Sequence, residues 1–288
     1  MIKRMLGNTG YEVSPVAYGG IVSMKDGQAN SDRYVSWAID RGINYFDVAP
    51  LYGDAQEKLG HSLRPYRKDV YLACKTFTRR AAEARRELKE SMRLLQTDYF
   101  DNYQMHSLQS VDEVEDAFSK GGVMGLIAPL WEKGDLRKLG ITCHDEAAAL
   151  RAMELFDFDT VLFPLNWHMH IGRGFGGAVT RAAKERGMGV LAIKGLIERR
   201  WLSDEEREAS PFPKSWCKPI DLEDKRLRTA ALKYTLSLGA DTLIPPGDFV
   251  NFAFAVENID ECLSRPLGDE DMRLLKTAYE NVKEYPFF

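Results

Sequence analysis

The stretch INYFDVAPLYGDAQEKLGHSLRPYRKDVYLACKT, residues 43–76, decides the fold of this chain. Its two ends, 43–49 and 70–75, are short apolar runs of the kind that form buried strands. Between them, the apolar residues of 56–63 recur at helical spacing. A strand, a helix and a second strand in this order indicate two parallel strands joined by a right-handed helical crossover.

The same unit recurs along the rest of the chain. Strand-like segments occupy residues 16–20, 43–49, 70–75, 99–106, 139–142, 160–166, 189–194 and 242–246. Helix-like segments follow them at residues 30–41, 56–63, 81–95, 123–133, 146–155, 179–186, 225–238 and 251–263. Eight such units predict an α/β fold, a (β/α)8 TIM barrel, which needs about 250 residues. The alternative is a doubly wound open sheet, but AYGGIV at 17–22 lacks the GxGxxG pattern expected after its first strand.

Three segments lie outside the eight units. The turn sequence GNTG at 7–10 separates two short runs and predicts an N-terminal β-hairpin. Residues 197–220 carry three prolines and no clean period, which predicts a long loop on the barrel face, and loops of that length usually serve function. Residues 268–282 predict an extra C-terminal helix. Because no linker or low-complexity tract interrupts the chain, we expect residues 1–288 to form one domain.

Composition and charge narrow the classes of function. The formal net charge is −4, which leaves no basic excess for binding nucleic-acid phosphates or an anionic membrane. The four cysteines lie far apart, unlike those of zinc sites, iron–sulfur clusters or disulfide frameworks. No signal-peptide stretch precedes the GNTG turn, and no window approaches 18 apolar residues. We therefore expect a cytoplasmic protein whose partner is a small molecule, with no nucleic acid and no membrane.

Four polar residues stand at or just after the ends of apolar strands. Asp47 ends the second predicted strand, Lys75 the third and His106 the fourth, and Tyr52 follows Asp47 by five residues. Active sites of (β/α)8 barrels are built from the carboxyl ends of the strands and the loops that follow them. We therefore expect these four side chains to meet and to be catalytic.

Together the four side chains suit the protonation of an oxygen that develops negative charge. A tyrosine has an unperturbed pKa near 10, and a lysine ammonium about 4 Å away would favour its phenolate by up to about three pK units at an effective dielectric near 20. Asp47 would keep Lys75 charged, while His106 would donate a hydrogen bond to the substrate oxygen or share in relaying the proton. The set contains no nucleophile–base pair, so acyl transfer is poorly served.

At these residues the sequence resembles the aldo-keto reductase family. The similarity covers essentially the whole chain and is carried by GINYFDVAPLYG at 42–53, by Lys75 and by DYFD at 98–101 leading to His106. All four strand-end residues match the family's catalytic aspartate, tyrosine, lysine and histidine position by position. The resemblance implies NAD(P)H-dependent reduction of an aldehyde or ketone, or the reverse alcohol oxidation, with Tyr52 as general acid or base.

The resemblance also implies a set of cofactor-binding residues. They are Asp47, Thr142, His144, Asn166, Lys194, Gly247, Asp248, Glu257 and Asn258. Cys143 and His144 depart from the serine and asparagine that many members carry there, and Leu162 replaces a frequent glutamine.

The stretch after the last predicted strand bears on which dinucleotide is used. Residues 248–256 lack the basic side chains that usually hold the 2′-phosphate of NADP(H), and they begin with Asp248. A carboxylate there would repel a phosphate but could accept a hydrogen bond from a free ribose hydroxyl. We therefore expect NAD(H) to be accepted at least as well as NADP(H), unless Arg199 or Arg200 in the long loop supplies the missing charge.

Aromatic residues supply the candidate substrate contacts. We expect Tyr18, Trp167 and Trp201 to bind the substrate. For the tryptophans, and for Trp216 and Phe212 in the long loop, the alternative is packing against the barrel, since aromatic side chains dominate both pockets and cores.

Two other functions compete with the reductase. The family's fold also serves as β subunits of potassium channels, so a non-catalytic, cofactor-sensing regulatory subunit is the alternative, although all four catalytic residues are present here. A metal-dependent hydrolase would use His106, His144, His168 and His170, yet no acidic ligand stands at a diagnostic spacing and Tyr52 would have no role. His168 and His170 alternate at a predicted strand end, where two residues share a face without needing a metal. We therefore expect no metal site.

Overall fold

The parallel strands of the protein pair with one another in chain order. The computed structural model describes residues 1–287. In that part of the chain the strands are β3 (Tyr18–Gly19), β4 (Tyr45–Asp47), β5 (Tyr71–Thr76), β6 (Asn102–Leu108), β7 (Leu139–Cys143), β8 (Thr160–Pro164), β9 (Gly189–Ile193) and β12 (Thr242–Ile244). A parallel bridge between Val16 and Leu243 joins the first strand to the last. The predicted (β/α)8 barrel is therefore confirmed.

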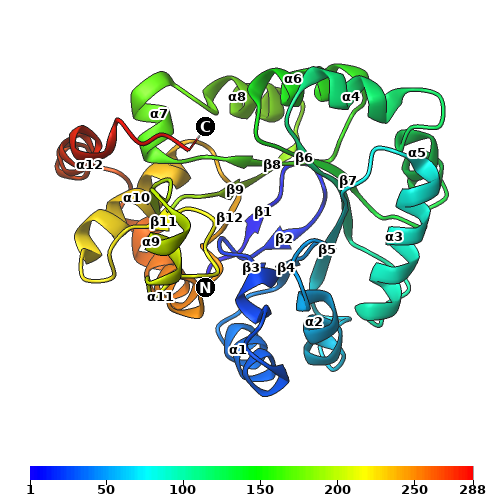
Figure 1. Ribbon diagram of the computed structural model, residues 1–288, viewed down its shortest axis with the longest axis horizontal. Coiled ribbons are helices and arrows are strands. Elements are labelled where there is room, and N and C mark those ends of the chain that lie inside the picture. The colour runs from blue at the N-terminus through cyan, green and yellow to red at the C-terminus, as the bar shows by residue number, and fades with distance from the viewer. Residues whose placement is uncertain (288) are drawn as a thin grey trace.

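Helices surround the strands as an outer ring (Figure 1). They are α1 (Gln28–Asp40), α2 (Ala55–Leu63), α3 (Ala81–Leu94), α4 (Val111–Phe118), α5 (Met124–Glu132), α6 (Glu146–Leu155), α7 (Trp167–Arg173), α8 (Gly177–Glu185), α10 (Lys225–Ser237), α11 (Phe249–Ser264) and α12 (Asp269–Val282). The C-terminal helix is present as predicted and packs against α10 and α7. That the chain forms one domain stays a prediction.

The N-terminal hairpin closes the amino end of the barrel. Strands β1 (Arg4–Met5) and β2 (Glu12–Val13) pair antiparallel, as the GNTG turn predicts. Leu6 and Val13 are fully buried and belong to a cluster inside the barrel. The other members of that interior cluster are Ala17, Tyr45, Ala73, Leu162, Leu191 and Ile244. Gly7 has a φ of 51°, and a side chain there would collide with the backbone of Met188 and Gly189, so the turn requires glycine.

Two predictions about the second half of the chain are wrong. Residues 197–220 are not an irregular loop throughout, because β10 (Ile197–Arg199) pairs with β11 (Lys218–Pro219) and α9 (Asp204–Glu208) lies between them. Residues 168 and 170 do not lie at a strand end, because α7 begins directly after Asn166, whose side chain caps it. Gly174, with a φ of 69°, ends that helix before α8 starts.

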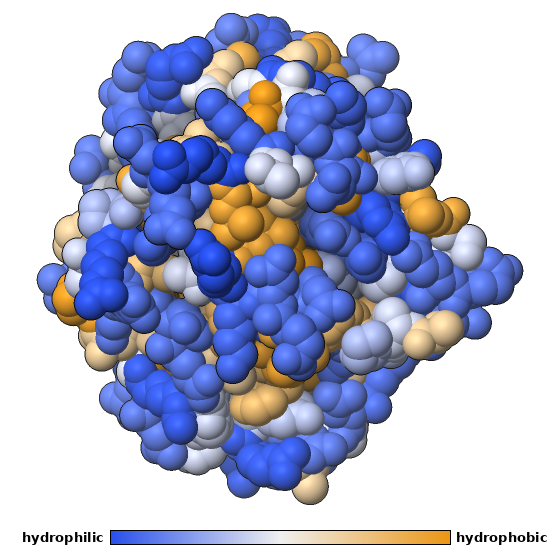
Figure 2. Space-filling model, turned by 90° about the vertical axis from the view of Figure 1, so that its left-hand side faces the viewer, coloured by the Kyte–Doolittle hydropathy of each residue, from blue (hydrophilic) through white to orange (hydrophobic). Residues whose placement is uncertain are grey.

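The outer surface is mostly hydrophilic on the face shown in Figure 2, and apolar residues gather in a hollow at its middle. Within residues 1–287 no helix is both long and apolar enough to cross a membrane.

Candidate active site

The four predicted catalytic residues lie together in one pocket at the carboxyl end of the barrel. Asp47 ends β4, Lys75 lies near the end of β5, His106 lies on β6, and Tyr52 follows β4 in a loop. All four line the same pocket and are at most 9% exposed. Asp47 pairs in register with Ala73, two residues before Lys75, and Lys75 pairs with Gln104, two residues before His106. The three side chains therefore lie diagonally on the same face of neighbouring strands, and the short segment after β4 brings in the tyrosine.

Lys75 is held by contacts that keep it charged. Its ammonium contacts the carboxylate of Asp47 and donates a hydrogen bond to the carbonyl oxygen of Val48, 3.2 Å away. Burial alone would lower the pKa of Lys75, but the negative charge of Asp47 and the neighbouring Tyr52 outweigh it, and the pKa is raised. A buried ammonium therefore lies 5.2 Å from the centroid of the Tyr52 ring.

The net pKa shift of Tyr52 differs from the sequence-based expectation. Burial raises the pKa of the phenol, and the opposing charge of Lys75 offsets that effect only in part. The cost of removing the phenolate from water is larger than its attraction to the ammonium, and the sequence alone does not reveal that cost. Tyr52 therefore carries its proton at neutral pH, as a proton donor must.

His106 is neutral. Burial lowers its pKa to about 2, and the nearby cations Lys75 and Arg79 contribute to the same shift. The guanidinium of Arg79 fixes this end of β6 by donating to the carbonyl oxygens of His106 (2.8 Å) and Ser107 (3.1 Å). The imidazole packs edge-on against the Tyr52 ring, with centroids 5.8 Å apart.

The pocket wall after β7 contains two of the predicted cofactor residues, Thr142 and His144. The hydroxyl oxygen of Thr142 accepts a hydrogen bond from the backbone N–H of Ser107. Nδ1 of His144 lies 3.3 Å from the Ser107 hydroxyl, and burial lowers the pKa of His144 to about 3. Both side chains thus present neutral polar groups to the pocket.

Two residues at or beside the pocket wall hold unusual backbone conformations. Ser107 has a φ of 56° and Lys194, directly after β9, has a φ of 68°. Lys194 lines the pocket as predicted, and burial lowers its pKa. Left-handed backbone in residues other than glycine costs about 1–3 kcal/mol and tends to cluster at functional sites.

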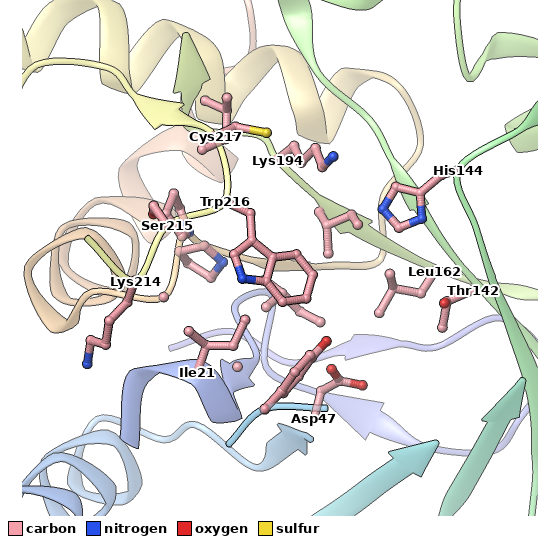
Figure 3. A pocket seen from close by; sticks show the side chains of 18 of the residues that line it. Ile21, Asp47, Thr142, His144, Leu162, Lys194, Lys214, Ser215, Trp216 and Cys217 are labelled. Carbon is pink, nitrogen blue, oxygen red and sulfur yellow. The ribbon is translucent and has the colours of Figure 1, made fainter. Parts of the chain in front are cut away.

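The long loop closes the opposite side of the pocket with Lys214, Ser215, Trp216 and Cys217. The indole of Trp216 lies in the middle of the pocket above Asp47, with Thr142 and His144 on the far side (Figure 3). Its ring centroid is 5.8 Å from that of Tyr52, and the side chain is 51% exposed. Of the two alternatives for Trp216, the structure therefore supports pocket lining.

Sequence comparison assigns the chain to a family. The sequence profile described as "Aldo/keto reductase family" matches residues 21–240. The chain belongs to the aldo/keto reductase family. Its members are oxidoreductases, in agreement with the resemblance carried by residues 42–53 and by the strand-end cluster.

Individual relatives agree with this assignment. The chain is 27% identical to L-galactose dehydrogenase of Arabidopsis thaliana over 263 residues, which cover 81% of the chain and 80% of that protein. It is 30% identical to the aldo-keto reductase YhdN of Bacillus subtilis over 156 residues, covering 48% of the chain and 45% of YhdN. The chain thus spans about half the length of this relative and of a second Bacillus subtilis oxidoreductase, YqkF.

Solved structures show the same fold. An aldo-keto reductase of Bacillus halodurans, solved in its holo form, is 21% identical, covers 96% of both chains and has a TM-score of 0.70. The glycerol dehydrogenase of Gluconobacter oxydans is 18% identical, covers 99% of this chain and 97% of its own, and also has a TM-score of 0.70. At these identities the likeness concerns the fold alone.

A second hollow lies beside the start of α11 and shares one lining residue with the pocket. Gly247 lines the pocket, Asp248 lines the hollow, and Lys214 lines both. Asp248 is 7% exposed, and burial raises its pKa to about 6 against the opposing effects of Lys214 and of the Ser215 hydroxyl. Glu257 and Asn258, predicted to bind the cofactor, lie further along α11 and line neither cavity.

The basic residues near Asp248 are not the two that the sequence suggested. Arg199 forms an ion pair with Glu206 within the long loop. Lys25, Arg207 and Lys214 line the hollow instead. Lys214 is itself held across the pocket mouth, because its ammonium donates to the carbonyl oxygen of Val22 (2.9 Å) and to Asp26 (2.7 Å).

Several other predicted site residues do not line the pocket. Asn166 caps α7, accepts hydrogen bonds from the backbone there and donates to the carbonyl oxygens of Lys194 and Ile197. It therefore positions the segment after β9 and does not face a ligand in this conformation. Tyr18 and Trp167 are fully buried core residues. Trp201 packs within the long loop, where its indole N–H donates to the carbonyl oxygen of Ser215.

The two histidines of α7 serve the packing of the helix. Nδ1 of His168 lies 2.9 Å from the carbonyl oxygen of Glu198, and Nδ1 of His170 lies 2.8 Å from the Tyr234 hydroxyl. In the part of the chain that the structure describes, no group of three or more histidine, cysteine or acidic side chains is arranged to hold a metal.

Proposed function

We propose that this protein is an NAD(P)H-dependent reductase of small aldehydes or ketones, which also catalyses the reverse oxidation of alcohols. The observation that carries the proposal is the buried group of Tyr52, Lys75, Asp47 and His106 in one pocket. A protonated phenol beside a buried ammonium and a neutral imidazole matches the needs of carbonyl protonation.

The pocket and the hollow beside Asp248 offer polar groups for the two ends of a dinucleotide. The pocket is lined by residues from Tyr52 to Gly247, and the hollow shares the side chain of Lys214 with it. The buried hydroxyl of Ser215 lines the pocket and the buried carboxylate of Asp248 lines the hollow, so both would offer hydrogen bonds to a polar ligand. Thr142, His144 and Lys194 would hold one end of the cofactor, and Gly247 and Asp248 the other.

When bound, the reduced nicotinamide supplies the hydride that adds to the carbonyl carbon. The carbonyl oxygen gains negative charge as this happens, and Tyr52 donates its proton to it. Lys75 stabilises the phenolate that remains, and Asp47 holds Lys75 beside the ring. Neutral His106 donates a hydrogen bond that orients the oxygen. In the reverse direction the phenolate of Tyr52 accepts the proton of the alcohol.

Trp216 is the aromatic residue best placed to contact the substrate. Its indole faces Tyr52 from across the pocket, and half of its surface is exposed. It would shield the reacting atoms from water on the side that the barrel leaves open.

A direct experiment uses the unmodified protein. Binding of NADH and NADPH is measured by fluorescence titration, and reduction of a panel of aliphatic, aromatic and sugar aldehydes is followed by loss of the reduced nicotinamide absorbance. We expect binding of at least one dinucleotide and turnover of at least one carbonyl compound. Dinucleotide binding with no turnover across the panel would favour the regulatory alternative.

A further inference from the structure

One face of β6 carries a column of polar side chains into the barrel interior. Asn102, Gln104 and His106 alternate along the strand, so their side chains share a face. The amide nitrogen of Asn102 donates to the hydroxyls of Tyr45 on β4 (2.9 Å) and Thr160 on β8 (2.8 Å). Neither strand neighbours β6, so these bonds cross the interior. Gln104 therefore points into the barrel directly beneath His106.

Gln104 is fully buried, yet neither end of its carboxamide has a hydrogen-bond partner among the described protein atoms. A buried polar group without a partner costs about 1–3 kcal/mol, and native proteins rarely leave one unsatisfied. The register partners of Gln104 are Lys75 on β5 and Gly140 on β7. A Cβ at Gly140 would collide with the Thr160 hydroxyl and approach Cγ of Gln104, so glycine at this position lets both side chains occupy the interior.

The same region contains other buried polar atoms without protein partners. They are Nδ1 of His106 and Oγ1 of Thr242. A buried water normally makes two to four hydrogen bonds to polar groups of this kind. Adjacent same-face positions on a strand are about 6.6 Å apart, a span that a glutamine side chain and one water can bridge.

A water bridge between Gln104 and His106 would have a chemical consequence, because the imidazole of His106 is neutral. A neutral imidazole carries its proton on one nitrogen, and the hydrogen bond made by the other nitrogen decides which. Nδ1 of His106 is sealed in the interior. If Nδ1 accepts a hydrogen bond, the proton is on Nε2, where it can be donated to a carbonyl oxygen in the pocket.

We propose that Gln104 is a positioning residue that acts on His106 through internal water. Its amide nitrogen donates to a water that donates to Nδ1 of His106, and this fixes the tautomer with the proton on Nε2. Its amide oxygen accepts from the same interior water network beside Lys75. This inference rests on the proposed function for its catalytic meaning, but the tautomer of His106 exists without cofactor or substrate.

The test is nuclear magnetic resonance of the imidazole nitrogens in 15N-labelled, cofactor-free protein. The chain has five histidines, and a His106→Asn variant identifies the signals of His106. We expect the unmodified protein to hold His106 with the proton on Nε2. In Gln104→Met, which keeps the length of the side chain and removes both polar atoms, we expect the Nδ1-protonated form to appear.

Asn102→Leu is the matched control, because it removes another interior carboxamide from the same face of β6. We expect it to leave the tautomer of His106 unchanged. In turnover assays Gln104→Met should lower kcat roughly tenfold, as loss of an orienting partner commonly does, while the Kd of the dinucleotide stays constant. Asn102→Leu should retain kcat. Gln104→Asn keeps an amide donor on a shorter side chain, and water can bridge the added distance. This variant should therefore have a kcat between those of Gln104→Met and the unmodified protein.

A proton on Nδ1 in the unmodified protein would overturn the inference, and that measurement needs no variant to fold. So would a folded Gln104→Met protein with the original tautomer. If only the proposed function is wrong, the result is different. The protein then reduces no carbonyl compound, but the tautomer of His106 still changes in Gln104→Met.

Discussion

The two ends of the pocket are built in different ways. At the reacting end, Asp47, Lys75 and His106 lie on three consecutive strands, and the register of the sheet fixes their separation. At the other end, Lys214 comes from the long loop. Asp248 lies between the last strand, β12, and α11, immediately before the helix begins. The first arrangement is rigid because the barrel cannot slide its strands. The second depends on a loop that Lys214 holds across the pocket mouth. Mutations at the two ends should therefore affect activity to different extents.

The reacting end should show the largest effect when Tyr52 is changed. We predict that Tyr52→Phe lowers kcat for carbonyl reduction by at least about 100-fold, because it removes the general acid, and leaves the Kd of the dinucleotide nearly unchanged. Steady-state kinetics and fluorescence titration measure the two quantities. Tyr66→Phe, a half-buried tyrosine outside the pocket, is the control and should behave as the unmodified protein. A Tyr52→Phe rate within tenfold of the unmodified protein would remove Tyr52 from the mechanism.

Lys75→Met tests the electrostatic part of the same end. Lys75 lowers the pKa of Tyr52 against the effect of burial, so its loss raises that pKa further. Alcohol oxidation needs the phenolate and increases as pH rises through this pKa, so the limb of the pH profile should move to higher pH. Turnover at neutral pH should fall by roughly tenfold or more.

The variant also leaves the buried carboxylate of Asp47 without its partner, which costs about 3–5 kcal/mol of stability. The double variant Asp47→Asn, Lys75→Met removes both charges and serves as the folding control. Identical pH profiles for the unmodified protein and a folded Lys75→Met variant would show that Lys75 does not tune Tyr52.

At the loop-built end we predict that kcat/KM with NADH is at least equal to that with NADPH. The carboxylate of Asp248 repels a 2′-phosphate, and Lys214 is occupied by Asp26. Asp248→Asn should shift the ratio towards NADPH by up to about fivefold, the size of one partly screened charge interaction. The ratio is measured with one carbonyl substrate and each cofactor.

Arg207→Gln is the companion variant, because Arg207 lines the same hollow. A preference of the unmodified protein for NADPH of a hundredfold or more, lost in Arg207→Gln, would show that the loop supplies the missing positive charge.

The smallest expected effect concerns pH. The pKa of His106 is lowered to about 2 and that of His144 to about 3, so both are neutral well above those values, and Tyr52 stays protonated below its raised pKa. At saturating cofactor, kcat for carbonyl reduction should therefore be nearly independent of pH between about 5 and 8, because the titration of Asp248 near pH 6 acts on cofactor binding. An activity transition near pH 6.5 that disappears in His106→Gln would contradict the neutral state of His106.

The strand-built end is also the end that the sequence predicts well. An apolar run that ends in a polar residue identifies Asp47, Lys75 and His106, and parallel register brings them together. The sequence gives no comparable indication of Trp216 as a pocket residue, because its position depends on how residues 197–220 fold over the barrel. The sequence predicts α8 but not α7, because the glycines at 174 and 176 between the two helices are typical of a loop.

Burial decides the roles of two aromatic residues and the pKa of Tyr52, and the sequence does not reveal burial. The fully buried positions of Tyr18 and Trp167 follow from three-dimensional packing, and aromatic side chains alone do not distinguish a core from a pocket. The raised pKa of Tyr52 depends on how completely the pocket excludes water, which no motif states.

The left-handed backbone at Ser107 and Lys194 sets a limit on how this protein can be made more heat-resistant. Glycine would relieve the strain at either position, as it would at Lys25 and Gln96, which share the conformation. Gln96 lines neither the pocket nor the hollow beside Asp248, so glycine there would remove no side chain from either cavity. At Lys194 the exchange would delete a side chain of the pocket wall, and at Lys25 it would delete a side chain of the hollow. Selection for thermal stability alone would therefore tend to accept glycine at all four positions, whereas selection for catalysis would retain the strain at the positions that border the site.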